Sequence, residues 1–401
     1  MSQDVARPGV ALAVLITTLV ALGPLSTDFY LPSLPALTEA LGTDVAGAQM
    51  TLSVFLVGFA VGQLFYGPLS DRFGRRPALL AGLFIYLLGS LGCTFAADIE
   101  WLIAARFAQA LGACAGPVLG RAIVRDLYGP HDAARMLSYV GAAMALAPLL
   151  GPLLGGWLSV WFDWRACFVF LSLYSAALLL ASGWMLGESN HHRDRDATRP
   201  GHIVANYRSL LADRHYLGVL LCNGLAYAAL FSFISASSFV FIGLFGFSPQ
   251  AMGLAFGAMV SGYIVGSTGS GRLGARFGSE RLLGAGALTG TVAGAAMLGL
   301  ALAGVEQPLA VMIPMWFAAC AIGVVMPNAV ALGLAPYPRM AGAAASLMGF
   351  SQMGLAALAG LWVGHSFSGS VLPMAALIAG GMAGSLLAWL LWVRGKRAAV
   401  A

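Results

Sequence analysis

The stretch Gly67-Pro-Leu-Ser-Asp71-Arg72-Phe73-Gly74-Arg75-Arg76 follows a long apolar segment, and a shorter version of it, Leu273-Gly-Ala275-Arg276-Phe277-Gly278, begins 204 residues after Leu69. Four residues recur at equivalent places in the two stretches: Leu69, Arg72, Phe73 and Gly74 in the first, and Leu273, Arg276, Phe277 and Gly278 in the second. The second copy has Ala275 where the first has Asp71. Because the spacing is about half the chain, the repeat predicts two structurally equivalent halves.

The composition excludes a water-soluble enzyme. Of the 401 residues, 59% are hydrophobic and 9% are charged, whereas a soluble domain carries about 25% charged residues. The apolar residues form continuous runs long enough for helices that cross a bilayer, which takes about 20 residues. A spanning β-barrel would instead show alternating segments of about 10 residues. The sequence therefore predicts an all-α integral membrane protein.

Twelve apolar segments are predicted to span the membrane as two pseudo-symmetric six-helix bundles. We expect the first bundle at residues 1–187, a charged linker at 188–214 and the second bundle at 215–401. The segments are 10–33, 46–66, 78–97, 101–122, 134–160, 165–186, 215–242, 249–271, 281–304, 308–330, 342–364 and 371–393.

The basic residues predict the orientation. In this arrangement all of the 21 basic residues except Arg106 and Arg165 fall at one face, which places both termini in the cytoplasm by the positive-inside rule. Basic residues gathered at one face are typical of a signal that orients a membrane protein, and not of a nucleic-acid-binding patch. His191 and His192 in the linker have no further ligand nearby, and the five cysteines show no CxxC spacing, so we expect neither a metal site nor a cofactor.

Two charged residues, Asp28 and Arg106, are the clearest charges inside the predicted helices. An ionised side chain there costs about 3 kcal/mol or more, and so usually has a function. Asp28 lies in the first helix and Arg106 in the fourth, both in the outer half of one bundle, and we predict that they take part in proton coupling. In the alternatives, the first helix ends at Ser26 and Asp28 caps a loop, or Arg106 only binds helix-end carbonyls.

The predicted substrate cavity lies between the bundles. Its candidate residues are Tyr30, Gln109, Asn223, Tyr227 and Phe231, of which the last three recur every four residues and share a helix face with Ser235. Such stripes also occur at plain helix contacts. The second half offers amides, methionines and aromatic residues but no charge inside its helices, a composition that suits bulky, weakly polar ligands.

Two further motifs are rich in turn-forming or small residues. In the 67–76 stretch, Gly67, Asp71, Arg72, Gly74, Arg75 and Arg76 have the composition of a cytoplasmic gate, although the arginines could act only as an orientation signal. In the fifth segment, Pro148, Gly151, Pro152, Gly155 and Gly156 permit close helix contact and bending. Ordinary tight packing would explain this second motif equally well.

These motifs together resemble a known family. The 67–76 stretch is similar to the signature between the second and third helices of the major facilitator superfamily, and Arg106, Gln109 and Gly112 resemble its fourth-helix motif. The run 147–156 resembles the motif of its drug:proton antiporters, with Ala147 in place of the usual glycine. The runs 24–35, 49–53 and 339–344 resemble the Bcr/CflA branch, which includes bicyclomycin and phenicol exporters of the bacterial inner membrane.

The resemblance implies proton-driven export of amphipathic drugs. It implies that Asp28 is the acid of the first helix, that Asp71 and Arg72 belong to the gate, and that Arg106 lies in the proton relay. We predict a multidrug antiporter in the bacterial inner membrane, working as a monomer on small molecules and protons within the lipid bilayer. Export of an endogenous metabolite is the nearest alternative. A membrane-embedded enzyme is disfavoured, because no catalytic groups converge in the helices. A non-transporting sensor is the other alternative, and a transport measurement would distinguish it.

Overall fold

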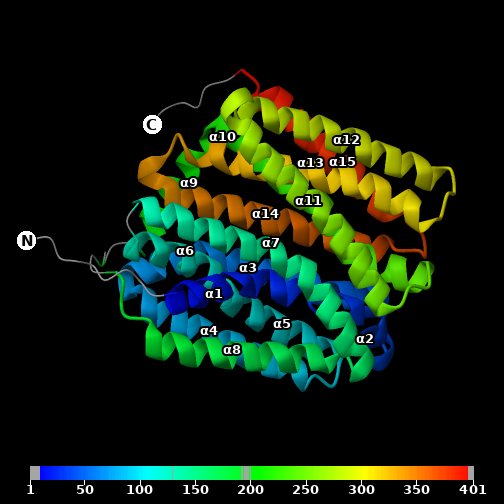
Figure 1. Ribbon diagram of the computed structural model, residues 1–401, viewed down its shortest axis with the longest axis horizontal. Coiled ribbons are helices and arrows are strands. Elements are labelled where there is room, and N and C mark those ends of the chain that lie inside the picture. Colours follow the sequence, from blue (N-terminus) through cyan, green and yellow to red (C-terminus); the bar gives the residue numbers. More distant parts are fainter. Residues whose placement is uncertain (1–9, 129, 191–192, 194–197, 199, 396–401) are drawn as a thin grey trace, which may run out of the picture.

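The computed structural model describes residues 10–128, 130–190, 193, 198 and 200–395. These residues form helices joined by short turns, with no β-strand among them. The long helices run side by side in one general direction (Figure 1). This arrangement suits a membrane, because a helix satisfies its own backbone hydrogen bonds where no water can. The predicted all-α class is confirmed. The paired histidines of the linker lie outside the described residues.

The first half of the chain contains eight α-helices and one short 3-10 helix. They are α1 Val10–Asp28, η1 Leu31–Ser33, α2 Leu34–Ala40, α3 Val45–Phe73, α4 Arg75–Thr94, α5 Ile99–Ala113, α6 Ala115–Leu127, α7 Pro130–Trp161 and α8 Arg165–Met185.

A short helix, α9 Pro200–Ala212, precedes the second half. The helices that follow are α10 Arg214–Ser238, the π-helical η2 Phe239–Leu244, α11 Pro249–Phe277, α12 Ser279–Leu302, α13 Pro308–Leu334, the 3-10 helix η3 Pro338–Met340, α14 Ala341–Ser366, α15 Leu372–Ala388 and the π-helical η4 Trp389–Val393.

In the described residues, twelve helical stretches are long and apolar enough to cross a membrane, which is the predicted number. Their ends differ from the predicted ones by at most seven residues. The first span is extended to Ala40, and α3 and α11 continue past their apolar runs to Phe73 and Phe277. Hydropathy predicts the part of a helix that is immersed in lipid, whereas the helix itself continues until a residue ends it.

A glycine ends both of these helices. Gly74 has φ +108° and Gly278 has φ +78°, and each donates its N–H to the carbonyl four residues back. Residues with a side chain rarely adopt such angles. The helices α3 and α11 are each 29 residues long and begin 204 residues apart, at Val45 and Pro249. The sequence repeat is therefore a structural repeat as well.

Two of the twelve spans are interrupted. The first is divided where α1 ends at Asp28 and η1 begins at Leu31, because Pro32 has no N–H to continue the helix. The fourth is divided at Cys114, between α5 and α6. Both interruptions place backbone carbonyls and polar side chains in the interior of the first half.

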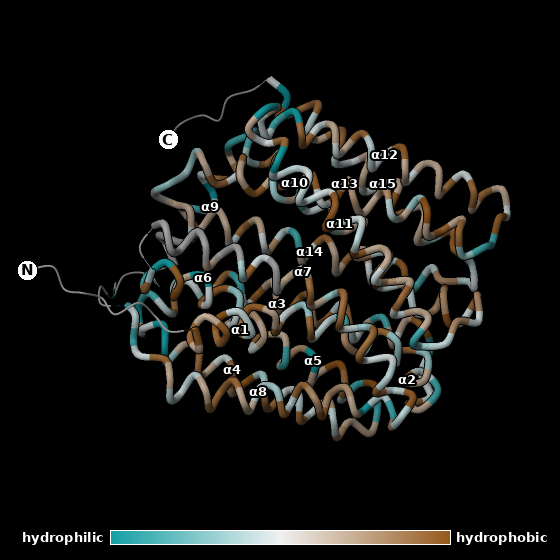
Figure 2. Tube along the Cα trace, in the orientation of Figure 1, coloured by the Kyte–Doolittle hydropathy of each residue, from teal (hydrophilic) through white to brown (hydrophobic). Residues whose placement is uncertain are grey.

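The two halves meet along two helix pairs, α3 with α14 and α7 with α11. In Figure 1 these four helices run through the middle of the molecule. We call the end that carries α9 and the start of α10 the linker end, and the end that carries η1, α2 and η2 the far end. Figure 2 shows hydrophobic residues along the middle of most helices and many of the hydrophilic ones near these two ends.

Candidate functional site

Asp28 is the last residue of α1, and only 3% of its surface is exposed. Its Oδ1 accepts a hydrogen bond of 3.0 Å from Thr27 Oγ1. It forms no ion pair with any residue that the structure describes. The helix continues past Ser26 and the carboxyl group is enclosed by protein, so the alternative in which Asp28 caps an exposed loop does not fit.

Both halves of the chain approach Asp28. On one side, a Cβ atom added to Gly151 of α7 would lie 3.4 Å from the Cβ atom of Asp28. On the other side, Tyr227 of α10 interacts electrostatically with Asp28 and also with Tyr263 of α11. The buried acid of the first span therefore lies near the boundary between the halves, which is where an alternating-access transporter binds its ligands.

Arg106 of α5 is completely buried. Its Nη1 donates to the Ser26 carbonyl at 3.1 Å and to Gln109 Oε1 at 2.5 Å. Its guanidinium carbon lies 4.2 Å from the ring centre of Phe55 and 4.5 Å from that of Tyr30. Nη2 has no hydrogen-bond partner among the described residues. Carbonyl oxygens and aromatic faces thus stabilise the charge without a carboxylate.

Gln109 and Tyr30 belong to the surroundings of Arg106. Gln109 Nε2 donates to Ser90 Oγ at 2.8 Å, and the Tyr30 hydroxyl lies 2.9 Å from Thr51 Oγ1. Both side chains are fully buried. Gln109 packs within the first half beside Gly89 of α4, so the structure groups it with Arg106 and not with the residues between the halves.

Asp28 and Arg106 do not form a pair. The arginine instead binds the carbonyl of Ser26, two residues before Asp28 in the last turn of α1. The same turn is held by the Tyr86 hydroxyl, which lies 2.6 Å from Ser26 Oγ. The two predicted residues are therefore brought close through the backbone of α1, and Arg106 positions the turn that carries the acid.

The predicted stripe on α10 lies on one face, as its four-residue spacing requires. Asn223 Nδ2 donates to Gln352 Oε1 of α14 at 3.0 Å, and one turn later Tyr227 approaches Asp28. Phe231 lies within 3.0 Å of a Cβ atom added to Gly360 of α14. The stripe therefore runs along the boundary between the halves.

At the far end, hydrogen bonds connect the two halves directly. Gln49 Nε2 of α3 donates to the Ser235 carbonyl at 2.6 Å, and Ser235 Oγ donates back to Gln49 Oε1. Ser238 Oγ donates to the Leu31 carbonyl at 2.5 Å. We call these three bonds the far-end contact.

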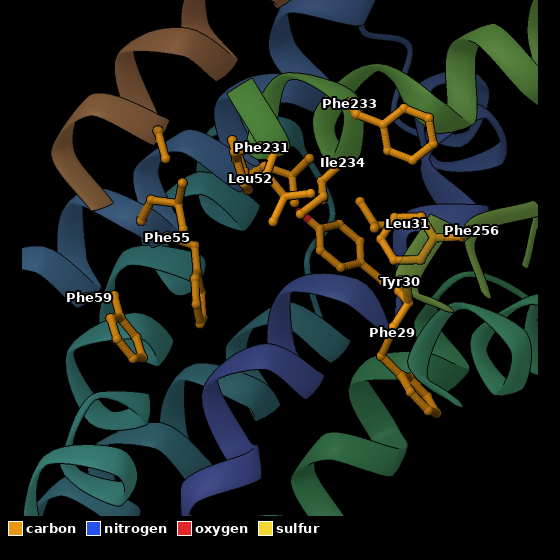
Figure 3. Close-up of a cluster of buried hydrophobic side chains, with 14 of the residues drawn as sticks. Phe29, Tyr30, Leu31, Leu52, Phe55, Phe59, Phe231, Phe233, Ile234 and Phe256 are labelled. Atoms are coloured by element: carbon orange, nitrogen blue, oxygen red, sulfur yellow. The ribbon is translucent and has the colours of Figure 1, made fainter. Parts of the chain in front are cut away.

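Apolar side chains surround the far-end contact. Leu31 and Leu52 from the first half lie close to Phe231 and Ile234 from the second in Figure 3. All four side chains are buried. The structure thus has its two halves joined at the far end. The sequence contained no sign of this contact beyond the polar type of Gln49 and Ser235.

The small residues of α7 let it approach both halves. A Cβ atom on Gly155 would overlap the Phe29 carbonyl of the first half, and one on Gly156 would lie 2.8 Å from the Pro249 carbonyl of α11. The backbone of Pro152 lies 3.0 Å from a Cβ atom added to Gly253. Pro148 is half-buried, one turn from Gly151 and Pro152. The motif therefore lies between α1 and α11, beside Asp28.

The 67–76 stretch forms the connection between α3 and α4 at the linker end. Arg75 Nη1 binds Asp71 Oδ1 at 2.5 Å, and Arg75 Nε binds Asp126 Oδ2 of α6 at 3.0 Å. Ser70 Oγ donates to the Gly67 carbonyl at 2.8 Å. Asp126 was not predicted, because its place beside Arg75 depends on how α6 packs against α3 and α4.

A second residue that was not predicted, Glu188, caps α4. Its carboxylate accepts from the backbone N–H groups of Arg75 at 2.9 Å and Arg76 at 3.4 Å. Arg76 Nη2 donates to a carbonyl at the end of α8, and Arg72 Nη1 to Thr198 Oγ1. The start of the linker is therefore bound to the predicted gate residues.

An apolar cleft of about 310 Å³ lies elsewhere, between α11 and α13. Met259, Met312 and Trp316 are among its lining residues. Ile313 and Phe317, which also line it, have about half of their surface exposed. Exposed apolar side chains on a spanning helix face lipid, so this cleft is separate from the polar groups at Asp28.

The family of the chain is shown by comparison with known proteins. The model of the major facilitator superfamily matches residues 16–361. The chain belongs to the major facilitator superfamily.

The relatives are bacterial transporters and resistance proteins. The chain is 33% identical over 371 residues to an uncharacterized MFS-type transporter of Bacillus subtilis, with 92% of each chain covered. It is 29% identical to a bicyclomycin resistance protein homolog of Haemophilus influenzae, with 88% of each covered. It is 30% identical to a chloramphenicol resistance protein of Pseudomonas aeruginosa, with 83% of this chain and 77% of that protein covered. These similarities support the drug-resistance branch that the sequence resembles.

Solved structures confirm the fold. The xylose transporter XylE of Escherichia coli, in a partially occluded inward open conformation, superposes with a TM-score of 0.75 at 14% identity, covering 98% of each chain. At that identity the similarity concerns the fold alone. The protein is thus a multi-pass transporter of the bacterial inner membrane and not an enzyme.

Proposed function

We propose that this facilitator-family transporter exports amphipathic drugs from the cytoplasm in exchange for protons, by alternating access. Residues 1–187 and 215–401 are the two units that move against each other, and residues 188–214 link them. The linker end faces the cytoplasm, in agreement with the positive-inside rule. Such a drug exporter works as a monomer with its whole cavity inside one chain.

The observation that carries the proposal is the position of Asp28. It is a buried acid without a cationic partner among the described residues. Gly151 of the first half packs against it, and Tyr227 of the second half interacts with it electrostatically. An acid in that position can release a proton when water reaches it from one side and take one up from the other. Binding of cargo in the same space would compete with protonation.

The chain segment after Asp28 offers a route from protonation to movement. Tyr30 packs under Arg106, and the Leu31 carbonyl accepts a hydrogen bond from Ser238 of the second half. Only two residues, Phe29 and Tyr30, thus separate the acid from the far-end contact. A change of charge at Asp28 would act directly on the contact between the halves.

The energy available is sufficient for useful export. One charge that crosses 100 mV provides about 2.3 kcal/mol. A neutral cargo exchanged for one proton could therefore be concentrated about fiftyfold.

The cargo proposed is a weakly polar, amphipathic molecule such as bicyclomycin or a phenicol antibiotic. Relatives named for resistance to bicyclomycin and chloramphenicol support this choice. So does the boundary between the halves, where Tyr227 and Phe231 of α10 offer aromatic surface. Export of an endogenous metabolite would use the same acid and the same movement.

Drug susceptibility tests the proposal. An efflux-deficient host expressing the parent should grow at higher concentrations of chloramphenicol or bicyclomycin than a host expressing Asp28→Asn. The matched control is Asp98→Asn, which removes a charge from an N-cap at the far end, because asparagine caps a helix as well as aspartate.

Transport into energised inverted vesicles supplies the second measurement. The parent should accumulate drug, and collapse of the proton gradient should abolish the accumulation. If Asp28→Asn protects the host as well as the parent does, the proton site is elsewhere. Accumulation that persists without a gradient would refute proton exchange.

A further inference from the structure

Three uncharged amide side chains lie along α14, which packs against α3 of the other half, on the linker side of the Asp28 region. Asn223 of α10 is bonded to Gln352 of α14. Gln63 of α3 lies against the backbone of α14 at Gly349, where an added Cβ atom would overlap its amide. Gly349 and Gln352 are three residues apart and so share a helix face. The group includes residues from both halves of the protein.

These amides have unused hydrogen-bonding capacity. Asn223 Oδ1 is buried and has no partner among the described residues. Turning both amides so that oxygen and nitrogen exchange places would still leave Asn223 with one bond and one unpartnered atom. Gln63 is 8% exposed, and no hydrogen bond of its amide occurs within the part of the chain that the structure describes. A buried polar atom without a partner is destabilising, typically by 1–3 kcal/mol.

We propose that Gln63, Asn223 and Gln352 form the subsite that recognises a neutral hydroxyl or amide group of the cargo. The inference rests on the proposed export function and names the class of molecule exported. Amides can both donate and accept, but they do not compensate the desolvation of an ionic group. A ligand hydroxyl or N–H can donate to the unpartnered oxygen, and a ligand carbonyl or hydroxyl can accept from an amide N–H.

The position of the subsite explains how one cargo could use both the amides and the acid. Asn223 and Tyr227 are one turn apart on the same face of α10, about 6 Å along the helix axis. Tyr227 in turn interacts electrostatically with Asp28. A drug-sized molecule therefore reaches from the amides to the acid, with its apolar part against the aromatic ring between them.

Replacing the amides by apolar side chains of similar volume distinguishes a role in ligand recognition from a role in stability. In the double variant Asn223→Leu with Gln352→Met, both buried amides disappear while the side-chain volumes stay similar. A purely structural pair would lower the melting temperature when it is removed. A binding pair with an unpartnered oxygen should leave the melting temperature unchanged or raise it, since no orphaned polar atom remains.

The probes are chloramphenicol, a neutral molecule with two hydroxyls and an amide, and tetraphenylphosphonium, a cation without hydrogen-bonding groups. Equilibrium binding to the purified protein should weaken at least tenfold for chloramphenicol in the double variant and in Gln63→Met. Binding of tetraphenylphosphonium should change less than twofold. The control variant is Asn328→Leu, because that amide already bonds to Ser270 Oγ and the Val324 carbonyl, and it should change the affinity for neither probe.

The outcomes are distinct. Equal affinities of parent and double variant for chloramphenicol, or equal losses for both probes, would overturn the subsite. So would a parent that binds the cation but not chloramphenicol. If the parent binds chloramphenicol but moves neither probe under a proton gradient, the export function fails, and the binding comparison still decides the subsite.

Discussion

The far-end contact allows a direct test of how the halves are held together. Gln49 makes two hydrogen bonds to Ser235 across the boundary, and Gln49→Met removes both. Methionine retains the aliphatic part of the glutamine side chain. This part packs against α14, since the Cβ atom of Gln49 would lie 2.8 Å from a Cβ atom added to Gly364. The substitution therefore removes bonds and leaves the packing largely intact.

The expected effect follows from the number of bonds lost. Each neutral hydrogen bond contributes about 0.5–1.5 kcal/mol, so two contribute about 1–3 kcal/mol to the conformation in which the far end is closed. A difference of that size changes a conformational equilibrium by about 5- to 150-fold. With a shift of about 30-fold, a far-end-open state that holds 1% of the parent would hold about a quarter of the variant.

Spin labels at Ala40 of α2 and Gln307 before α13 would report the separation of the halves at the far end, since both residues are exposed. Distances between the labels should show a larger separated population in Gln49→Met than in the parent. The matched control is Ser232→Ala, because Ser232 is as buried as Ser235 but donates to the Ala228 carbonyl of its own helix. An unchanged distance distribution in Gln49→Met, or an equal change in Ser232→Ala, would refute the reasoning.

Two further substitutions test the contacts of α7 and α4. Gly155→Ala should destabilise the protein by about 1–3 kcal/mol, because the new methyl group overlaps the backbone carbonyl of Phe29, just after α1. Gly141→Ala on the same helix faces open space and should leave the melting temperature unchanged or slightly higher. Glu188→Gln removes the charged cap of α4 and should cost about 0.5–2 kcal/mol, seen as a melting temperature lower by a few degrees. Glu306→Gln, at an exposed turn, should have no such effect, and an equal loss in either control would contradict the assigned contact.

Much of the fold could be predicted because the membrane imposes a simple rule. A spanning segment must be apolar and long, so the twelve helices are visible as runs of hydrophobic residues. Interruptions of those helices were harder to predict. Pro32 accounts for the end of α1, and Pro117, the third residue of α6, for the division at Cys114, because neither has an N–H to continue the helix. Pro148 and Pro152 lie inside the unbroken helix α7, so a proline in an apolar run does not by itself predict an interruption.

The sequence showed which residues belong to the candidate site, but not which of their side chains contact each other. Asp28 and Arg106 stand out because charges inside spanning helices are rare. The sequence left open that Arg106 binds helix-end carbonyls, and the Ser26 carbonyl in the last turn of α1 is such a partner. The aromatic rings around Arg106 follow from tertiary packing, as does the enclosure of Asp28 with only a threonine hydroxyl as its partner. Gln109 shares a helix face with Arg106. The spacing of the two residues does not show whether this face packs against the second half or against other helices of the first half.

The duplicated backbone does not carry duplicated chemistry. In the first half, Arg75 is held by two carboxylates at the turn after α3, whereas the equivalent turn of the second half has Ala275 in place of Asp71. The first half also contains Asp28 and Arg106, whereas the second half contributes the uncharged side chains of Asn223, Tyr227 and Gln352. The buried charges therefore lie in the first half, whereas the uncharged amides come from both halves, Gln63 among them. We infer that substitutions at Asp28 and Arg106 alter the response to protons, and that substitutions at the three amides alter which molecules are carried.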